Sequence, residues 1–232
     1  MSLLGKDDEI QIYRESFDET WADGTPINQV RYIVLDTETT GLDPRKDSIV
    51  TIGAVAVEDG SICLDDQFEA LLRISHNTSS VVVHGITRDD ANEEGMDEVL
   101  ALRLLLGYLR DGVIVGHHIG FDVDIISEHC QRRFGLSLEN RWIDTMELTL
   151  HLEDAGAFGP PPDNGGRGHD FSLDGLCRRF DIQPHDRHTA AGDAFITAQI
   201  FMKLLRQAKQ YGRRTLGSLC ERYEDPSATP QA

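Results

Sequence analysis

The first part of the chain contains three apolar runs separated by short polar turns. Residues 32–35 form a β-rich run, residues 49–57 form a second, and a Glu-Asp-Gly-Ser turn at 58–61 leads into a third near 62–74. Because the connections are short, we expect neighbouring strands to run antiparallel. The pattern predicts a three-stranded meander.

Helical spacing and short apolar runs alternate along the rest of the chain. We expect, in order, a helix at 96–110, a strand at 113–116, a helix at 121–134, a strand at 141–143, a helix ending near 152, a helix from a Ser172 cap to Phe180, and a last helix capped by Thr189. The chain thus begins with a three-stranded meander and continues with alternating helices and strands, which gives five strands in all. This order indicates an α/β domain with helices on both faces of a mixed five-stranded sheet.

Three of these helices have predicted buried faces. The first is expected to bury Val99, Leu102, Leu106 and Leu109. The second places on one face Asp122, Ile125, Ile126 and His129. The last has the longest stripe, which consists of Ala194, Thr197, Ala198, Phe201, Leu204, Leu205 and Ala208.

The ends of the chain have a different composition from the middle. Residues 1–29 are expected to form an acidic extension with a short helix near 10–17, because 1–24 has no apolar period long enough for a core element. Residues 30–210 form the predicted domain and 211–232 a tail. The Gly- and Pro-rich loop at 154–170 is either a flap or partner surface, or a tolerated surface insertion.

Composition limits the class of protein. The 232 residues carry 40 acids and 22 bases, which gives a net charge of −18. Their 40% hydrophobic content excludes wholesale disorder. No apolar stretch reaches the roughly 18 residues of a membrane span, and the acidic N-terminus is unlike a secretory signal. The four cysteines form no CxxC pair, so we expect a reduced, cytoplasmic protein.

The net charge bears on ligands as well. It argues against a non-specific electrostatic grip on a long duplex, but not against a pocket that holds one strand end through metal ions. The basic residues of 203–214 have no acid between them, and they form either a strand-tracking surface or a solvated helix face.

Carboxylates lie where predicted strands end and predicted helices begin. Asp36 and Glu38 end the first strand and, being two residues apart, point to the same face. Asp122 lies near a helix start, and Asp193 lies one turn into the last helix. His188 lies on the loop before that helix, free to swing over Asp193. Taken singly, each has an ordinary alternative as a solvated or helix-start side chain.

Together these acids need positive charge between them. Four carboxylates that converge would raise one another's pKa values. Hard divalent cations resolve the repulsion, and Mg²⁺ or Mn²⁺ suits a site of carboxylates with one histidine. Two such ions about 4 Å apart stabilise the attacking and leaving oxygens in phosphoryl displacement.

The motifs also follow a family order. They are Val34–Leu42 (VLDTETTGL), His84–Thr87 (HGIT), Gly116–His117 followed by Phe121–Asp122, Asp144–Thr145, and His188 with Asp193. From about Arg31 to Leu205 the chain resembles the DEDDh 3′–5′ exonucleases, the family of the proofreading epsilon subunit of bacterial DNA polymerase III. The resemblance implies an RNase H-like fold and hydrolysis of single-stranded DNA or RNA 3′ ends to 5′-mononucleotides.

The resemblance also implies roles for single residues. Asp36, Glu38 and Asp193 correspond to ligands of one metal ion, and Asp36 with Asp122, directly or through water, to those of a second. His188 corresponds to the general base. The pocket for the terminal nucleotide corresponds to Thr39, Gly41, Leu42, His84 and Phe121.

The chain departs from the family pattern at two positions. His118 stands where the family usually has Asn, and Thr51 where Glu is frequent. Because neither is a metal-binding acid, altered local hydrogen bonding is expected rather than lost activity.

A DNA polymerase or another replication or repair protein is an expected partner. The alternatives are a silent module that binds nucleic-acid ends or a polymerase, an RNase acting on RNA 3′ ends, and an RNase H-type endonuclease.

Overall fold

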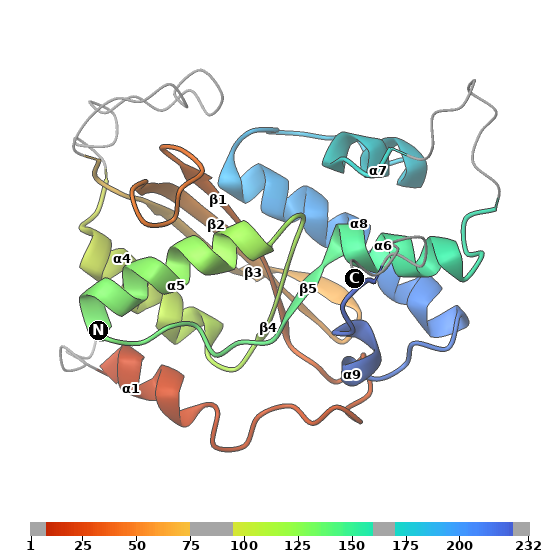
Figure 1. Ribbon diagram of the computed structural model, residues 1–232, viewed down its shortest axis with the longest axis horizontal. Coiled ribbons are helices and arrows are strands. Elements are labelled where there is room, and N and C mark those ends of the chain that lie inside the picture. The colour runs from red at the N-terminus through yellow and green to blue at the C-terminus, as the bar shows by residue number, and fades with distance from the viewer. Residues whose placement is uncertain (1–7, 75–94, 160–169, 225–232) are drawn as a thin grey trace, which may run out of the picture.

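A mixed five-stranded sheet forms the centre of the molecule (Figure 1). The computed structural model describes residues 8–74, 95–159 and 170–224. The strands are β1 (Tyr32–Thr39), β2 (Ile49–Glu58), β3 (Ser61–Leu71), β4 (Val113–Gly116) and β5 (Trp142–Asp144), in the order β3-β2-β1-β4-β5. The first three are antiparallel, whereas β4 runs parallel to β1 and β5 parallel to β4. The predicted meander and mixed sheet are confirmed.

Helices cover both faces of this sheet, as expected (Figure 1). They are α1 (Asp8–Glu15), α4 (Glu98–Leu109), α5 (Gly120–Phe134), α6 (Thr145–Asp154), α7 (Leu173–Phe180), α8 (Ala190–Gln210) and α9 (Leu216–Leu219). Helices α1, α4 and α5 pack on one face, and α6 to α9 on the other. The predicted caps are present: the Ser172 hydroxyl accepts from Gly175 N, and the Thr189 hydroxyl from Gly192 N.

Alternation along β1 divides the two cores. Tyr32 and Val34 pack in the core beneath α8, whereas Ile33 and Leu35 pack beneath α4 and α5. All four are buried, as the continuous apolar run predicted. The same alternation continues into the polar end of the strand, where it sets the geometry of the site.

The expectation that residues 1–24 contain no core element is wrong. Tyr13 of α1 is fully buried, and its hydroxyl donates to Asn140 Oδ1 at 2.7 Å. Burial raises the pKa of Tyr13 far above its ordinary value. A single aromatic anchor has no period, which is why apolar spacing did not reveal it.

The chain after α8 also contributes to the core. Leu216 and Leu219 of α9 are buried beside the α8 face, and Thr215 forms an isolated bridge with Pro26. Segments from both flanks therefore pack on the predicted domain.

One helix face differs from its prediction. Val99 is 38% exposed, whereas the buried residues of α4 are Ala101, Leu102, Leu105, Leu106 and Leu109. At 100° per residue, Val99 lies roughly 90° from the centre of that face, at its rim. The predicted faces of α5 and α8 are buried as expected. Within the described residues, no helix is long and apolar enough to cross a membrane.

Candidate active site

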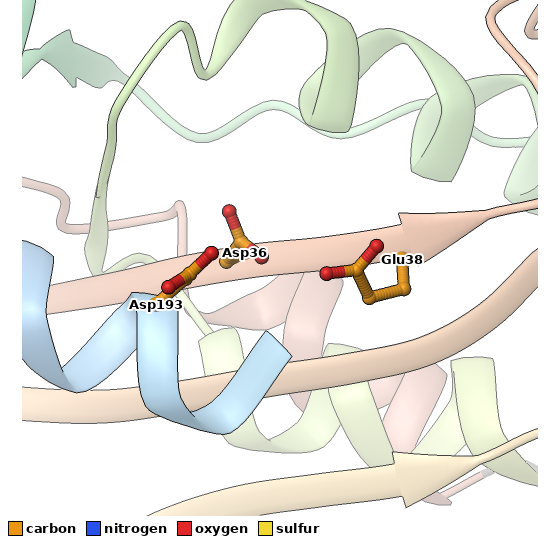
Figure 2. Close-up of side chains that lie close together, drawn as sticks. All are labelled: Asp36, Glu38 and Asp193. Carbon is orange, nitrogen blue, oxygen red and sulfur yellow. The ribbon is translucent and has the colours of Figure 1, made fainter. Parts of the chain in front are cut away.

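The polar end of β1 presents side chains to both faces of the sheet. Asp36 and Glu38 continue the series of Tyr32 and Val34 and point towards α8 (Figure 2). Thr37 points the other way and contacts Asp122 of α5. The strand therefore gives two of the predicted acids to one face and a hydroxyl to the other.

Helix α8 brings the third acid to the same place. Gly53 of β2 lies opposite Asp36 in the ladder, and a Cβ there would come within 2.3 Å of the Ala190 carbonyl carbon. Glycine thus lets the first turn of α8 press directly on the sheet. Asp193 lies in that turn, and one ligand oxygen each from Asp36, Glu38 and Asp193 lie within 4.8 Å of one another (Figure 2).

The cluster is electrostatically unfavourable without a cation. Burial raises the pKa of Asp36 well above its ordinary value, and the charges of Asp122, Asp193 and Glu38 raise it further. Burial, followed by the charges of Asp193 and Asp122, raises the pKa of Glu38 to about 7. Asp193 Oδ1 is buried without a hydrogen-bond partner in the described part of the chain. Converging carboxylates with an unpartnered oxygen fit a hard divalent cation.

Asp122 lies beside this group but is not part of it. It is buried in the first turn of α5, where its Oδ1 accepts from Thr37 N at 2.9 Å and from Thr37 Oγ1 at 2.6 Å. Burial raises the pKa of Asp122 to about 7, although the Thr37 bonds lower it. Of the four predicted metal acids, three converge, and the fourth is held behind β1.

His188 reaches the cluster through its backbone. Its N–H lies 3.4 Å from Asp193 Oδ2, and its side chain is exposed. The turn before α8 is tight, because Asp186 and His188 both have positive φ and a Cβ on Gly192 would lie 2.1 Å from the Asp186 carbonyl oxygen. His188 lies at the edge of the site, where its backbone contacts Asp193, and the role of its imidazole as a base stays a prediction.

Arg187 was not among the predicted site residues. One guanidinium nitrogen pairs with Asp193 Oδ2, and its Nε lies 2.9 Å from Asp174 Oδ1. Burial lowers the pKa of Arg187, but the hydrogen bonds to Asp174 and Asp193 together raise it above its ordinary value, so Arg187 stays charged. The signal that could have found it is its position, next to the candidate base and six residues before Asp193, on the turn that leads into α8.

The predicted nucleotide pocket is only partly described. Thr39 Oγ1 donates to the Gly41 carbonyl at 2.7 Å, just past the acids, and Leu42 is 85% exposed. Phe121 is half-buried against the α5 core. His84 and its HGIT motif lie outside the described residues, as do 160–169 of the Gly- and Pro-rich loop. Of the described members of this set, Thr39 and Gly41 are joined by a hydrogen bond, and the pocket as a whole stays a prediction.

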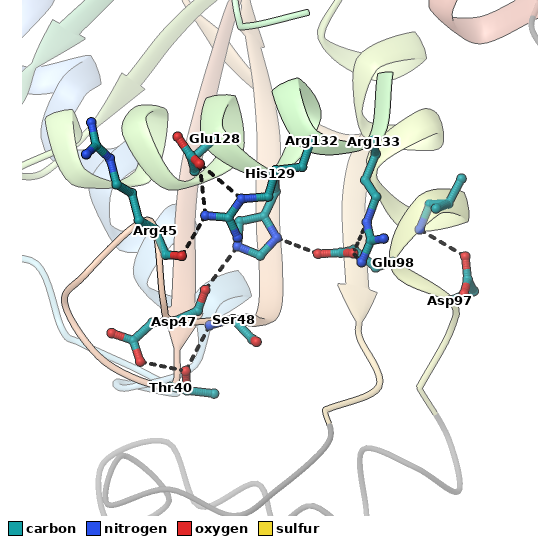
Figure 3. A network of polar contacts seen from close by, with 11 residues as sticks. Thr40, Arg45, Asp47, Ser48, Asp97, Glu98, Glu128, His129, Arg132 and Arg133 are labelled. Atoms are coloured by element: carbon teal, nitrogen blue, oxygen red, sulfur yellow. Dashed lines mark hydrogen bonds and ion pairs between the residues drawn. The ribbon is translucent and has the colours of Figure 1, made fainter. Parts of the chain in front are cut away.

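The loop after β1 is tied to α5 by a charged network (Figure 3). His129 Nε2 lies 3.0 Å from the Asp47 carbonyl oxygen, while Nδ1 pairs with the Glu98 carboxylate. The buried imidazole thus joins the Asp47 backbone of the loop to Glu98 in the first turn of α4. Arg132 also donates to the Arg45 carbonyl at 2.6 Å. This network, which the sequence did not reveal, anchors the loop that carries Gly41 and Leu42.

The motifs after β4 and β5 meet across the parallel pair. His117 Nδ1 lies 3.0 Å from Thr145 Oγ1, and His118 N donates to Asp144 Oδ1 at 3.2 Å. Burial lowers the pKa of His117 to about 4. His118, where the family has Asn, has φ +58°, a region that Asn tolerates well. Thr51, the other departure, has a buried hydroxyl without a partner among the described residues.

Comparison with known proteins identifies the family of the chain. The RNase T-type exonuclease family model matches residues 33–201, and the chain belongs to this exonuclease family. The predicted family is thereby confirmed. The chain is 32% identical over 221 residues to the DNA polymerase III PolC-type of Thermotoga maritima. It is 33% identical over 201 residues to a DNA polymerase III subunit epsilon-like protein of Rhodobacter capsulatus. Those matches cover 94% and 84% of this chain, but only 14% and 26% of the relatives.

Solved structures confirm the RNase H-like fold. E. coli Exonuclease I in complex with a dT13 oligonucleotide superposes with a TM-score of 0.68 at 18% identity, over 78% of this chain and 42% of that one. A zinc-bound form of the E. coli Exonuclease I complex with single-stranded DNA gives a TM-score of 0.69 at 17% identity, over 79% and 42% of the two chains. At this identity the likeness concerns the fold.

Proposed function

We propose that the chain is a 3′–5′ exonuclease of the DEDDh type that releases 5′-mononucleotides from single-stranded 3′ ends. The observation that supports this most strongly is the convergence of Asp36, Glu38 and Asp193, with a buried unpartnered oxygen, inside a chain of the exonuclease family. Membership in the family supplies the reaction class, and the acids supply the place where it would occur.

The proposed roles follow from these positions. Asp36, Glu38 and Asp193 would hold one Mg²⁺ or Mn²⁺, and Asp36 with Asp122, directly or through water, a second. When bound, the cations supply charge stabilisation for the attacking and leaving oxygens. His188, exposed at the edge, would accept the proton of the attacking water.

The substrate would be held next to these acids. Thr39, Gly41, Leu42, Phe121 and His84 would bind the terminal nucleotide, and an aromatic contact there accepts any base. The relatives named for polymerase III support a DNA strand as substrate and a polymerase, or another replication or repair protein, as partner. RNA 3′ ends are the second candidate substrate.

A 5′-labelled single-stranded oligonucleotide, as DNA and as matched RNA, tests the proposal with Mg²⁺ or Mn²⁺. We expect a ladder shortened from the 3′ end that EDTA and Asp36→Ala abolish. The faster of the two substrates identifies the natural class. Failure to shorten either strand with any metal would overturn the proposal.

Two other outcomes would replace it with a named alternative. Tight binding of an intact oligonucleotide in Mn²⁺ would favour a silent binding module. Cleavage of a circular single strand, which has no end, would favour an endonuclease.

A further inference from the structure

Arg187 connects the acid cluster to a neighbouring helix. Its Nε lies 2.9 Å from Asp174 Oδ1 in the first turn of α7, and its Nη1 pairs with Asp193 Oδ2 in the first turn of α8. The Arg187 side chain is 21% exposed and that of Asp193 11%, whereas that of Asp174 is 54% exposed. A largely buried cation is therefore held between an acid of the cluster and an acid outside it.

The two oxygens of Asp193 consequently have different surroundings. Oδ2 contacts the guanidinium of Arg187 and lies 3.4 Å from the His188 N–H. Oδ1 is buried and has no hydrogen-bond partner within the described residues, although a buried carboxylate oxygen normally has one. In Figure 2 the Asp193 carboxylate lies beside Asp36. One oxygen is fixed by the protein, and the other is left for a cation.

We propose that Arg187 is a positioning residue that fixes the Asp193 carboxylate so that its Oδ1 is presented to a divalent cation, and that Asp174 holds Arg187 in place. This rests on the proposed metal-dependent function of the same site. Outer partners of this kind orient the groups that touch a metal. The planar fork of arginine suits the task because it can grip two carboxylates at once in a fixed geometry.

The backbone supports a fixed rather than a mobile Arg187. The residues on either side, Asp186 and His188, both have positive φ, and Gly192 lies against the Asp186 carbonyl. Such a turn has few alternative conformations, so the guanidinium is directed at Asp193 before any cation arrives.

The competing explanation is that Arg187 is only a counter-charge that a metal ion must displace. The two explanations predict opposite effects. Removal of a competing positive charge would tighten cation binding, whereas removal of a positioning group would weaken it. Arg187→Lys separates them most directly, because it keeps the charge and loses the fork.

The test is calorimetric titration of Mn²⁺ into the full metal-free chain, without nucleic acid. We expect Arg187→Lys and Arg187→Gln to weaken Mn²⁺ binding by about 10- to 100-fold. Arg178→Gln is the matched control: it removes the same charge from α7, where Arg178 pairs with Asp170 rather than with the cluster. It should leave the affinity within about twofold. Unchanged or tighter binding in Arg187→Gln would overturn the proposal.

Asp174→Asn gives an independent measurement should the Arg187 variants fail to fold. The Asp174 side chain is about half exposed, so its replacement should preserve the fold while freeing Arg187, with a several-fold loss of affinity. Asp181→Asn, at the other end of α7, controls for the lost negative charge. Equal affinities in these two variants would also contradict the positioning role.

The outcome separates this inference from the function on which it rests. If the wild type binds Mn²⁺ and shortens oligonucleotides while the Arg187 variants bind Mn²⁺ normally, only the positioning role fails. If the variants lose Mn²⁺ but the wild type shortens no oligonucleotide, the positioning role stands and the exonuclease proposal fails.

Discussion

The carboxylates between β1 and α8 can be compared with the charged network around His129, on the other face of the sheet (Figures 2 and 3). In the network, Glu98 contacts His129 and Arg133, and these bonds lower its pKa. In the cluster, three acids converge and Arg187 pairs with one of them, Asp193, while the pKa of Glu38 rises to about 7. The charges of the His129 network therefore stabilise the folded state, whereas those of the acid cluster destabilise it.

The difference separates stability from function. Ionised acids that are buried together persist only because the rest of the fold supports them, and such sites are typical of catalysis. The His129 network needs no ligand, and it ties the loop after β1 to α4 and α5. Substitutions in the acid cluster should therefore reduce activity without loss of stability. Substitutions in the His129 network should instead reduce stability.

The largest expected effect is on activity. Asp36→Asn should reduce oligonucleotide shortening on the order of 10³-fold, because it removes the carboxylate shared by both proposed cations. The melting temperature of the metal-free variant should stay equal or rise, since the ionised Asp36 opposes folding. Activity in Mg²⁺ and melting in EDTA would be measured on the same preparation. A variant that is inactive because it is unfolded would contradict the comparison.

Divalent cations should reduce the charge repulsion within the acid cluster and should not affect the His129 network. At about 100 times the dissociation constant, Mn²⁺ should stabilise the chain by about 2.7 kcal/mol, a rise in melting temperature of roughly 5–10 °C. The Asp36→Ala/Asp193→Ala variant should lose most of this response, while Glu98→Gln should retain it. Equal rises in wild type and double variant would show that the cation binds elsewhere.

Sequence patterning predicted most of the elements and the acids of the cluster. Asp36 and Glu38 share a face because strand alternation is strictly local, and the Thr189 cap fixes the start of α8 and thereby the place of Asp193. The strand boundaries came from continuous apolar runs, which buried strands require.

The partners of these acids depend on contacts between distant segments. Arg187 acquires its role only because α7 places Asp174 beside it, and His129 only because the loop after β1 ends at Asp47. Gly53 is necessary because α8 crosses β2 at that residue. Spacing along the chain does not encode contacts between distant segments. The burial of Tyr13 in the core is another contact of this kind.

A change in the network should affect stability instead. His129→Gln should lower the free energy of unfolding by about 2–3 kcal/mol, because it removes the buried imidazole that joins the Glu98 carboxylate to the Asp47 carbonyl. Urea unfolding measures the loss, and amide exchange should increase in residues 40–48. The control His185→Gln replaces an exposed histidine and should change the free energy by less than about 0.5 kcal/mol. Equal losses in both variants would contradict the structural role of His129.

The smallest effects are two pH profiles of opposite sign, measured by urea unfolding in EDTA. The Glu38 pKa is raised, so its ionisation opposes folding increasingly from about pH 4.5 to about pH 7. Glu38→Gln should therefore stabilise the metal-free chain by about 1–2 kcal/mol above pH 7, a figure reduced for solvent screening of this partly exposed group. Near pH 4.5 the variant and the wild type should be equally stable.

Glu98→Gln should behave in the opposite way. The Glu98 pKa is lowered, so its charge stabilises the fold above the unfolded-state value near 4.5, and this contribution is lost as the pH falls through the folded-state value. The variant should be about 1 kcal/mol less stable than the wild type at pH 7 and should match it in acid. Because both variants replace one glutamate by glutamine, the sign of the difference reports only the surroundings. If both variants changed the free energy of unfolding at neutral pH in the same direction, the two regions would not differ in the way their geometry indicates.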